Sequence, residues 1–348
     1  IRFGEILGFG QMGCASVIAF MHALTLACCC GFIACKVNKL FRNKIAVLLC
    51  WAFFFFDPLL IWYSVTVWKD IVFSGVFLCF AFLLVEIVLR PDNFALKRSN
   101  IVLLVLFAVL SSLLRSNGFI AVGIALFVAC FIVSKQIRRA MRCVTICAVV
   151  LFVVVTIPVY RIAGVVPAHF AETVGVPLQQ ISRVVHDNGK LSEENEEYIQ
   201  SVLPLEEWGE LYNPGCPNSL KFSPDFDDDI LEGDKLKFIS NWVSIGIKNP
   251  GIYLRAWIAQ THDYWSLNST TWYTSAAGYD IGEGLKSNGH LNEFVSQSDL
   301  GKYLSLTVSA FPFVFSIGFL AWSMLGGSLI AFLSGRGKSL MFFLPFVV

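Results

Sequence analysis

The chain alternates between long apolar runs and short polar connectors, and one long polar segment extends from about Val165 to Gly301. A helix needs about 20 apolar residues to cross the hydrocarbon core of a bilayer. By this criterion the pattern predicts membrane spans on both sides of the polar segment. The predicted spans are Met12–Cys35, Ile45–Tyr63, Ile71–Leu89, Ile101–Leu114, Phe119–Val133, Cys143–Tyr160 and Leu304–Phe332, with an eighth beginning at Leu340.

This pattern predicts an all-α integral membrane protein, a polytopic helical bundle with a large, mainly helical extracytoplasmic loop. We expect residues 1–164 to form about six spans, residues 165–301 to form the loop, and residues 302–348 to form the C-terminal spans. The chain does not begin with Met and stops within an apolar run. Both ends are therefore interpreted as cut from a longer protein, with the last span truncated.

Basic residues concentrate in alternate connectors between the predicted spans. Because cytoplasmic loops carry an excess of Lys and Arg, these connectors are assigned to the cytoplasmic side. The outer face of the cell membrane then receives residues 64–70, residues 115–118 and the large loop. The basic residues concerned are Lys36, Lys39, Arg42, Lys44, Arg90, Lys97, Arg98, Lys135, Arg138, Arg139, Arg142, Arg336 and Lys338.

Inside the large loop, apolar positions recur at helical spacing, as in a small soluble unit. Ser192 is expected to cap a helix with an acidic first turn, and Pro204 interrupts that helix. A further helix is expected from Asp234 onward. Asn249 and Pro250 are then expected to cap and begin the next helix.

Composition narrows the possible partners. Hydrophobic residues make up 56% of the chain and charged residues 15%, which is typical of a protein whose main partner is the lipid bilayer. The net charge of +1 excludes a nucleic-acid partner, because a phosphate-binding surface needs clustered cations without compensating acids. No cofactor or metal is expected, since the acidic stretch from Asp225 to Asp229 is interpreted as a solvated turn. Asp57 is interpreted as a helix-breaking residue before Pro58.

Two groups of polar residues fall near the predicted outer ends of spans. Lys69 and Asp70 open one span, while Arg115 and Asn117 lie in a tight connector between two short spans. Charges at such depth are costly unless they are paired or functional. Two interpretations remain open: Arg115 extends to the interface and Asn117 forms the turn, or Lys69 and Arg115 bind the phosphate of a lipid-linked substrate.

A third polar group, Gln179, Gln180 and Arg183, lies within the large loop. If Pro177 begins a helix, Gln179 and Arg183 share one face of it, where an amide and a guanidinium would address one ligand together. A polar face that supports the loop's own fold would look the same. Both interpretations remain open from the sequence.

These residues occur in an order that resembles an uncharacterised bacterial family of polytopic membrane proteins, itself similar to the GT-C glycosyltransferases. The motifs that carry the resemblance are Trp68-Lys69-Asp70 with Ser74, Leu114-Arg115-Ser116-Asn117-Gly118, Pro177-Leu178-Gln179-Gln180-Ile181-Ser182-Arg183, Tyr212-Asn213-Pro214 and Lys248-Asn249-Pro250 with Tyr253. The resemblance covers most of the chain from Gln11 onward. It implies an enzyme that takes a sugar from a polyprenyl-phosphate carrier at the outer face.

The chain departs from this family in two places. Cys216-Pro217-Asn218 stands where the family tends to show an Asp-Pro-Val-Lys-like element, and Ser116 stands where a second Asn is common. The catalytic carboxylate of GT-C enzymes usually lies in the first outer loop, which would precede Ile1. The main base is therefore expected upstream of this sequence.

The function predicted from these observations is the transfer of a polyprenyl-phosphate-linked sugar to an envelope glycan or lipid acceptor. Lys69, Arg115 and Arg183 would stabilise the departing phosphate, and Asn117, Gln179 and Gln180 would donate hydrogen bonds. Asp70 would act as a secondary catalytic acid. The alternatives are a transporter or flippase of a lipid-linked or anionic substrate, and a non-catalytic scaffold.

Overall fold

The computed structural model describes residues 11–64, 68–89, 98–115, 117–165, 169–267 and 313–335, together with residues 8, 302–303, 306–307, 310–311, 340 and 346. These residues form helices and turns without any β-strand, so the predicted all-α class is confirmed for this part of the chain. The chain divides into two compact units. Unit 1 comprises residues 1–164, 274–311 and 323–348, and unit 2 comprises residues 165–273 and 312–322.

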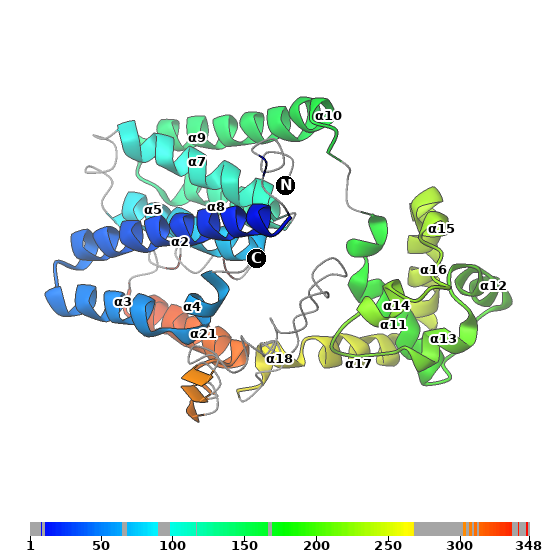
Figure 1. The fold of residues 1–348 in the computed structure, drawn as a ribbon. Helices are drawn as coiled ribbons and strands as arrows, with labels where there is room; N and C mark the ends of the chain where they lie inside the picture. The colour runs from blue at the N-terminus through cyan, green and yellow to red at the C-terminus, as the bar shows by residue number, and fades with distance from the viewer. Residues whose placement is uncertain are drawn as a thin grey trace. The chain divides into compact units, whose positions relative to one another are not determined.

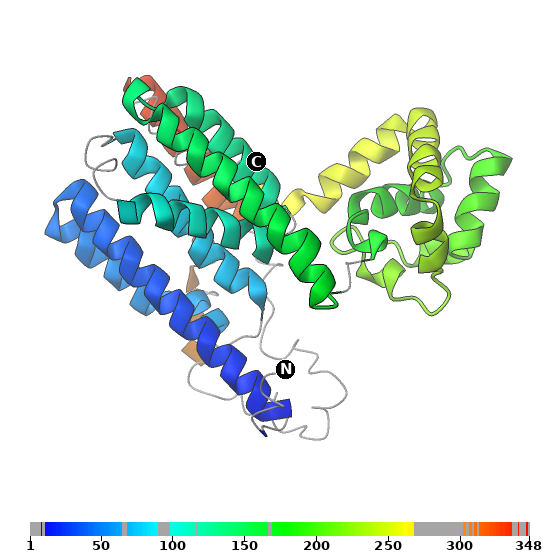
Figure 2. The same ribbon diagram turned by 90° about the horizontal axis from the view of Figure 1, so that it is seen from above.

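Unit 1 is a bundle of apolar helices (Figures 1 and 2). Helix α5 contacts α2, α7 and α8, while α9 packs against α7 and α8. Because short connectors join α7 to α8 and α8 to α9, consecutive helices run antiparallel and α7 runs parallel to α9. The helices are α2 (Gln11–Phe41), α3 (Lys44–Phe56), α4 (Pro58–Ser64), α5 (Lys69–Leu89), α7 (Arg98–Leu114), α8 (Gly118–Ile132) and α9 (Lys135–Val154), followed by the π-helical turn η1 (Val155–Val159) and α10 (Tyr160–Ile162).

The core of unit 1 lies around α5, α7 and α8. Phe80, Leu83 and Leu84 of α5 are fully buried and belong to one apolar cluster with Leu104 of α7. The start of α8 approaches α7 closely, since a Cβ atom at Gly118 would lie 2.4 Å from the Ser111 carbonyl oxygen. Only glycine therefore permits this approach of α8 to α7.

Among the residues that the structure describes, three helical segments are long and apolar enough to cross a membrane: Gly13–Phe41, Lys69–Ile87 and Ile137–Ile162. They correspond to the first, third and sixth spans predicted from the sequence. The other apolar helices, α3, α7, α8 and α21 (Ile317–Leu333), are shorter, at 13, 17, 15 and 17 residues. Within the Ile137–Ile162 segment only 11% of residues in the most apolar window are buried, so most of this surface is available to lipid.

The predicted span Ile45–Tyr63 is not one continuous helix. Asp57 has extended backbone angles (φ −70°, ψ 111°) that end α3, and Pro58 begins α4. A residue before proline is disfavoured in the helical region, which explains the position of the break. Asp57 Oδ1 then accepts a hydrogen bond from the Leu60 amide (3.2 Å), so its carboxylate caps the start of α4, in keeping with the helix-breaking interpretation.

Several predicted features fall wholly or partly outside the described residues. The described helix within the predicted span Leu304–Phe332 is α21, which a turn at residues 313–315 precedes. The large loop is described up to residue 267. The features outside the description are most of the eighth span and the side chains of Arg90, Lys97, Ser116, Arg336 and Lys338.

Unit 2 is a compact group of short helices (Figure 1). Helix α11 contacts α13, α16 and α17. Leu178, Ile181 and Val184 of α11 are fully buried and form an apolar core with Trp208 and Phe238. The elements are η2 (Phe170–Glu172), α11 (Gly175–His186), α12 (Glu193–Val202), α13 (Leu205–Glu210), α14 (Asn218–Lys221), α15 (Asp228–Gly233), α16 (Lys235–Lys248), α17 (Pro250–Gln260) and α18 (His262–Trp265).

The helix starts predicted in this unit are found at the expected residues, although two side chains have other partners. Ser192 occupies the N-cap of α12, but its hydroxyl donates to Asn195 Oδ1 (2.6 Å). Asn249 precedes α17, and its side-chain amide forms two hydrogen bonds with the backbone of Lys190, of 2.8 and 2.7 Å. Asn249 therefore connects the α16–α17 junction to the segment after α11. Asp234 caps α16 by accepting from the Lys237 amide.

Candidate functional site

The structure brings two residues of the predicted outer-face groups into contact at one end of unit 1. Lys69 and Asp70 are the first residues of α5, and Arg115 directly follows α7. Arg115 Nε lies 3.6 Å from Asp70 Oδ1, and its guanidinium lies 5.8 Å from the centre of the Phe73 ring. Asn117 is exposed at the N-cap of α8, with no side-chain cap hydrogen bond. Lys69 directly precedes Asp70 in the chain, and Asn117 follows Arg115 by two residues.

This ion pair remains open to solvent and ligands. The side chain of Arg115 is 52% exposed and that of Asp70 is 48% exposed. An exposed pair at this separation contributes at most about 1 kcal/mol to stability. Since the guanidinium has five N–H donors in a planar fork, Arg115 retains donors that can bind a phosphate.

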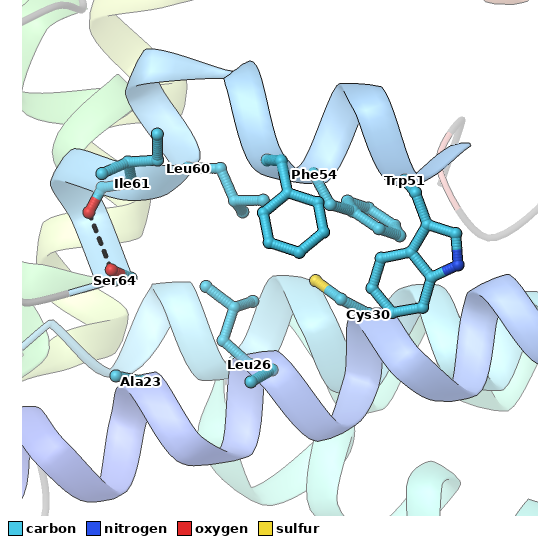
Figure 3. A pocket seen from close by; sticks show the side chains of 10 residues that line it. Ala23, Leu26, Cys30, Trp51, Phe54, Leu60, Ile61 and Ser64 are labelled. Atoms are coloured by element: carbon cyan, nitrogen blue, oxygen red, sulfur yellow. Dashed lines mark hydrogen bonds between the residues drawn. The ribbon is translucent and has the colours of Figure 1, made fainter. Parts of the chain in front are cut away.

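An apolar pocket of about 260 Å³ lies between α2 and the α3–α4 pair, within unit 1. Figure 3 shows Leu26 and Cys30 of α2 pointing toward Phe54 and Trp51 of α3. Ser64 borders the pocket, and its hydroxyl donates to the Ile61 carbonyl (2.7 Å). Nearly all of this lining is apolar, so the pocket suits a hydrocarbon chain rather than a charged group.

A second charged group lies at the other end of α5 and was not predicted from the sequence. Glu86 has 0% exposure, and its carboxylate accepts from Lys36 Nζ (2.5 Å) and from Lys39 Nζ. Both lysines belong to the last turns of α2, so these ion pairs hold α2 against α5. Asp70 and Glu86 are separated by roughly 24 Å along the helix, at about 1.5 Å per residue.

Sequence reasoning could have found Glu86 from one signal. It is the only acid within the predicted span Ile71–Leu89. An ionisable residue inside a span is a candidate functional or paired group by default. Its lysine partners could not be identified in this way, because they lie 50 and 47 residues earlier in the chain.

Gln179 and Gln180 are buried inside unit 2 and bond to its own backbone and side chains. Gln179 Nε2 donates to the Asn213 carbonyl (2.5 Å). Gln180 Oε1 accepts from Trp242 Nε1 (2.8 Å), and its amide nitrogen lies 3.4 Å from the Tyr253 carbonyl oxygen. These contacts tie α11 to the α16–α17 pair and to the turn at Asn213.

Arg183 belongs to a polar network around Asp187, the residue that follows α11. Its Nε lies 3.1 Å from Asp187 Oδ2, and its Nη1 donates to the Tyr212 hydroxyl (3.0 Å). These oxygens, Tyr212 first and then Asp187, raise the pKa of Arg183 above its ordinary value, so it stays charged. Arg255 and His186 also contact Asp187, at 3.4 and 2.9 Å. The face of α11 that Gln179 and Arg183 share thus contacts residues 212–213.

This network makes the stability of unit 2 dependent on pH. The hydrogen bond with His186, supported by Arg183 and Arg255, lowers the pKa of Asp187 below its ordinary value. A carboxylate with a lowered pKa stabilises the fold above its unfolded pKa of about 4, and this stabilisation is lost as the pH falls through the folded value. We expect wild-type protein to lose stability below about pH 4 more steeply than an Asp187→Asn variant. Acid unfolding curves that coincide for the two proteins would contradict this prediction.

Comparison with known protein families assigns nearly the whole chain to one family. A family described as "Family of unknown function (DUF6020)" matches residues 4–345. The chain belongs to the DUF6020 family. Comparison with curated proteins and with solved structures gives no match. Membership of a family of unknown function agrees with the expected uncharacterised family, and the DUF6020 description assigns no reaction to the residues above.

Among the described residues of this DUF6020 chain, no three His, Cys, Asp or Glu side chains come together as a metal site. The acidic stretch instead serves the local fold. Asp227 caps α15 by accepting from the Ile230 amide (3.2 Å), and Asp228 pairs with His169. The candidate polar groups of the described residues lie at the Asp70–Arg115 end of unit 1 and in the Arg183 network of unit 2.

Proposed function

We propose that this DUF6020 protein is a multi-pass membrane enzyme of GT-C-like plan. It would transfer sugar from a polyprenyl-phosphate carrier at the outer face of the cell membrane, in envelope polysaccharide or glycolipid assembly, with unit 2 on the extracytoplasmic side. The observation that supports it most is the Asp70–Arg115 pair, in which the exposed guanidinium of Arg115 lies at the start of α5. Lys36 and Lys39, which bind Glu86, lie near the other end of α5. This asymmetry fits an inner end marked by lysines and an outer end that meets substrate.

In the proposed reaction, the bond between the sugar's anomeric carbon and the carrier phosphate breaks as the acceptor oxygen attacks that carbon. Negative charge then grows on the departing phosphate. Arg115 and Lys69 would stabilise this charge, and Asn117 would add a hydrogen bond. Asp70 would serve as a secondary acid, and a general base would take the acceptor's proton.

The apolar pocket supports the lipid part of the proposal. A polyprenyl carrier has a branched hydrocarbon chain, and the lining of Leu26, Trp51 and Phe54 offers only apolar and aromatic contacts over most of its surface. Ser64 at its border ends α4, shortly before Lys69 in the chain. A carrier chain in this pocket could therefore leave its phosphate near Ser64, at the end of α4.

Within unit 2 the internal hydrogen bonds of Gln179 and Gln180 favour the second interpretation drawn from the sequence, a polar face that supports the fold of the unit itself. Arg183 keeps a partly exposed side chain and belongs to the proposed substrate-binding residues as a cation. Its bonds to Asp187 and Tyr212 would orient it.

The proposal is tested by the release of radiolabelled sugar from a polyprenyl-phosphate carrier by the purified protein in detergent. We expect Arg115→Ala to reduce the release rate by about 100-fold, the usual loss when one donor to a developing anion is removed. Arg161→Ala is the matched control, because Arg161 is an exposed arginine in α10 of the same unit. Equal rates for wild type and Arg115→Ala would contradict the phosphate-binding role.

A second candidate function, a transporter or flippase of a lipid-linked or anionic substrate, is favoured by Glu86. Ionisable residues buried within a membrane span often mark the path of an ion or a polar substrate. Carrier lipid that moves between leaflets of liposomes, without release of sugar, would support this candidate over the transferase. If Glu86→Gln abolishes this movement of lipid, the transport depends on the buried carboxylate.

A further inference from the structure

Helix α17 contributes one face to the core of unit 2 and exposes another. Tyr253 and Ala256 are buried, and Ile252 packs against the same apolar cluster. Apolar and aromatic side chains on the rest of α17 and along α18 lie at the surface instead. These exposed side chains, which we call the α17–α18 patch, are Leu254, Trp257, Ile258, Tyr264, Trp265 and Leu267.

The α17–α18 patch differs in charge from the other end of unit 2. Its six side chains are each between 43% and 57% exposed, although all of them are apolar or aromatic. Helix α17 contains no acidic residue, whereas α12, α13 and α15 all have acidic first turns. Figure 1 shows α12 and α13 at the end of unit 2 far from α18. Unit 2 therefore has an acidic end and an apolar end, and exposed apolar patches mark contact with a protein or a membrane.

The α17–α18 patch is continuous with α21, the apolar helix whose first residues belong to unit 2. Ser316, just before α21, is fully buried, and its hydroxyl donates to the Ser266 carbonyl (2.7 Å). Trp322 Nε1 donates to the Trp265 carbonyl (3.1 Å), and the centres of these two aromatic rings lie 6.1 Å apart. The exposed side of Trp265 therefore adjoins the surface of α21.

The surface of α21 indicates which medium lies beside the patch. None of its 17 residues is charged, and apolar side chains such as Leu320, Leu329 and Phe332 are exposed along it. Such a surface is more stable in lipid than in water. Trp and Tyr concentrate where a bilayer meets water, because their rings are apolar while their N–H and O–H groups form hydrogen bonds. Trp265 and Trp322 are therefore expected at this boundary, near the start of α21.

We propose that the α17–α18 patch lies in the interfacial region of the lipid bilayer. Trp257, Tyr264 and Trp265 are seated between the headgroups and the acyl chains, as in a helix that lies along a membrane surface. The acidic end of unit 2 stays in water. The inference rests on lipid contact by α21 and does not depend on the proposed transfer reaction.

Photocrosslinking of the full chain in liposomes tests this proposal. The photoreactive residue p-benzoylphenylalanine replaces Trp257 or Trp265, and the liposomes contain radiolabelled phosphatidylcholine. We expect irradiation to attach radioactive lipid to the protein from both positions. The control places the same residue at Gln200, which is exposed on α12 of the same unit. We expect this control to carry no label above background.

Three results of this experiment would overturn the proposal. Absence of label from both tryptophan positions would show that lipid does not reach the patch. Crosslinks from both positions to protein alone would show that another segment or a second copy covers it. Equal labelling from Gln200 would show that lipid does not distinguish the two ends of unit 2.

A second measurement uses conservative variants that retain an aromatic ring. Phospholipids with brominated acyl chains quench the fluorescence of tryptophans that contact them. We expect Trp257→Phe and Trp265→Phe each to reduce the part of the fluorescence that these lipids quench. A quenched part that stays unchanged in both variants would contradict the placement of α17 and α18 in the interface.

Discussion

Replacing Glu86 with alanine is expected to lower the free energy of unfolding by about 3–5 kcal/mol, the usual cost of breaking a buried ion pair from one side. The carboxylate has 0% exposure and accepts from both Lys36 and Lys39. Its removal leaves two ammonium groups beside each other at the contact of α2 with α5. Thermal unfolding of the purified protein in detergent measures the effect.

Two variants make this prediction specific. Glu86→Gln keeps an oxygen acceptor and should cost less than Glu86→Ala, because it removes charge while preserving one hydrogen bond. Asp70→Ala breaks the ion pair at the other end of α5, which is about half exposed, and should cost at most about 1 kcal/mol. If Glu86→Ala unfolds at the same temperature as Asp70→Ala, the buried ion pairs do not hold α2 to α5.

Replacing Trp208 with alanine is expected to destabilise unit 2 by about 3–5 kcal/mol, the usual range for an aromatic residue removed from a packed core. The side chain is 1% exposed and lies in the same apolar cluster as Leu178 and Phe238. Its indole nitrogen donates to the Ile199 carbonyl (2.9 Å), and its own carbonyl accepts from Ser182 (2.6 Å). The substitution therefore opens a cavity and removes a link between α12 and α13.

Limited proteolysis within residues 169–267, with near-ultraviolet circular dichroism, measures this loss. Trp257→Ala is the matched control, because Trp257 lies on α17 of the same unit and is exposed. We expect this control to change stability by about 1 kcal/mol or less. Equal protease sensitivity of the two variants would show that Trp208 does not organise the core.

The positions of the helices were largely predictable from the sequence. Apolar runs long enough to span a membrane depend on local composition alone, so Gly13–Phe41 and Lys69–Ile87 follow the predicted runs closely. Local signals also gave the starts of the helices after Ser192 and Asn249. The Asp-Pro pair signals the break at Asp57, although the apolar pattern around it predicts one span from Ile45 to Tyr63.

The candidate sites were predictable only in part. Asp70 and Arg115 come from two connectors that the pattern of basic residues assigns to the same side of the membrane. Their contact in the structure agrees with a common end of the bundle. The roles of Gln179 and Gln180 did not follow, because their partners are Asn213, Trp242 and Tyr253. Helical spacing showed that Gln179 shares a face with Arg183 but not what that face meets.

By itself the sequence determined that this protein is helical, that its apolar helices suit a bilayer, and that a polar, helical segment follows residue 164. These properties depend on composition and on spacing within a helix, which neighbours along the chain decide. The tertiary structure alone decided that Glu86 binds Lys36 and Lys39, and that Asn100 and Arg138 keep buried donors without partners. Such features depend on which helices pack together, and side chains tens of residues apart in sequence leave no local pattern.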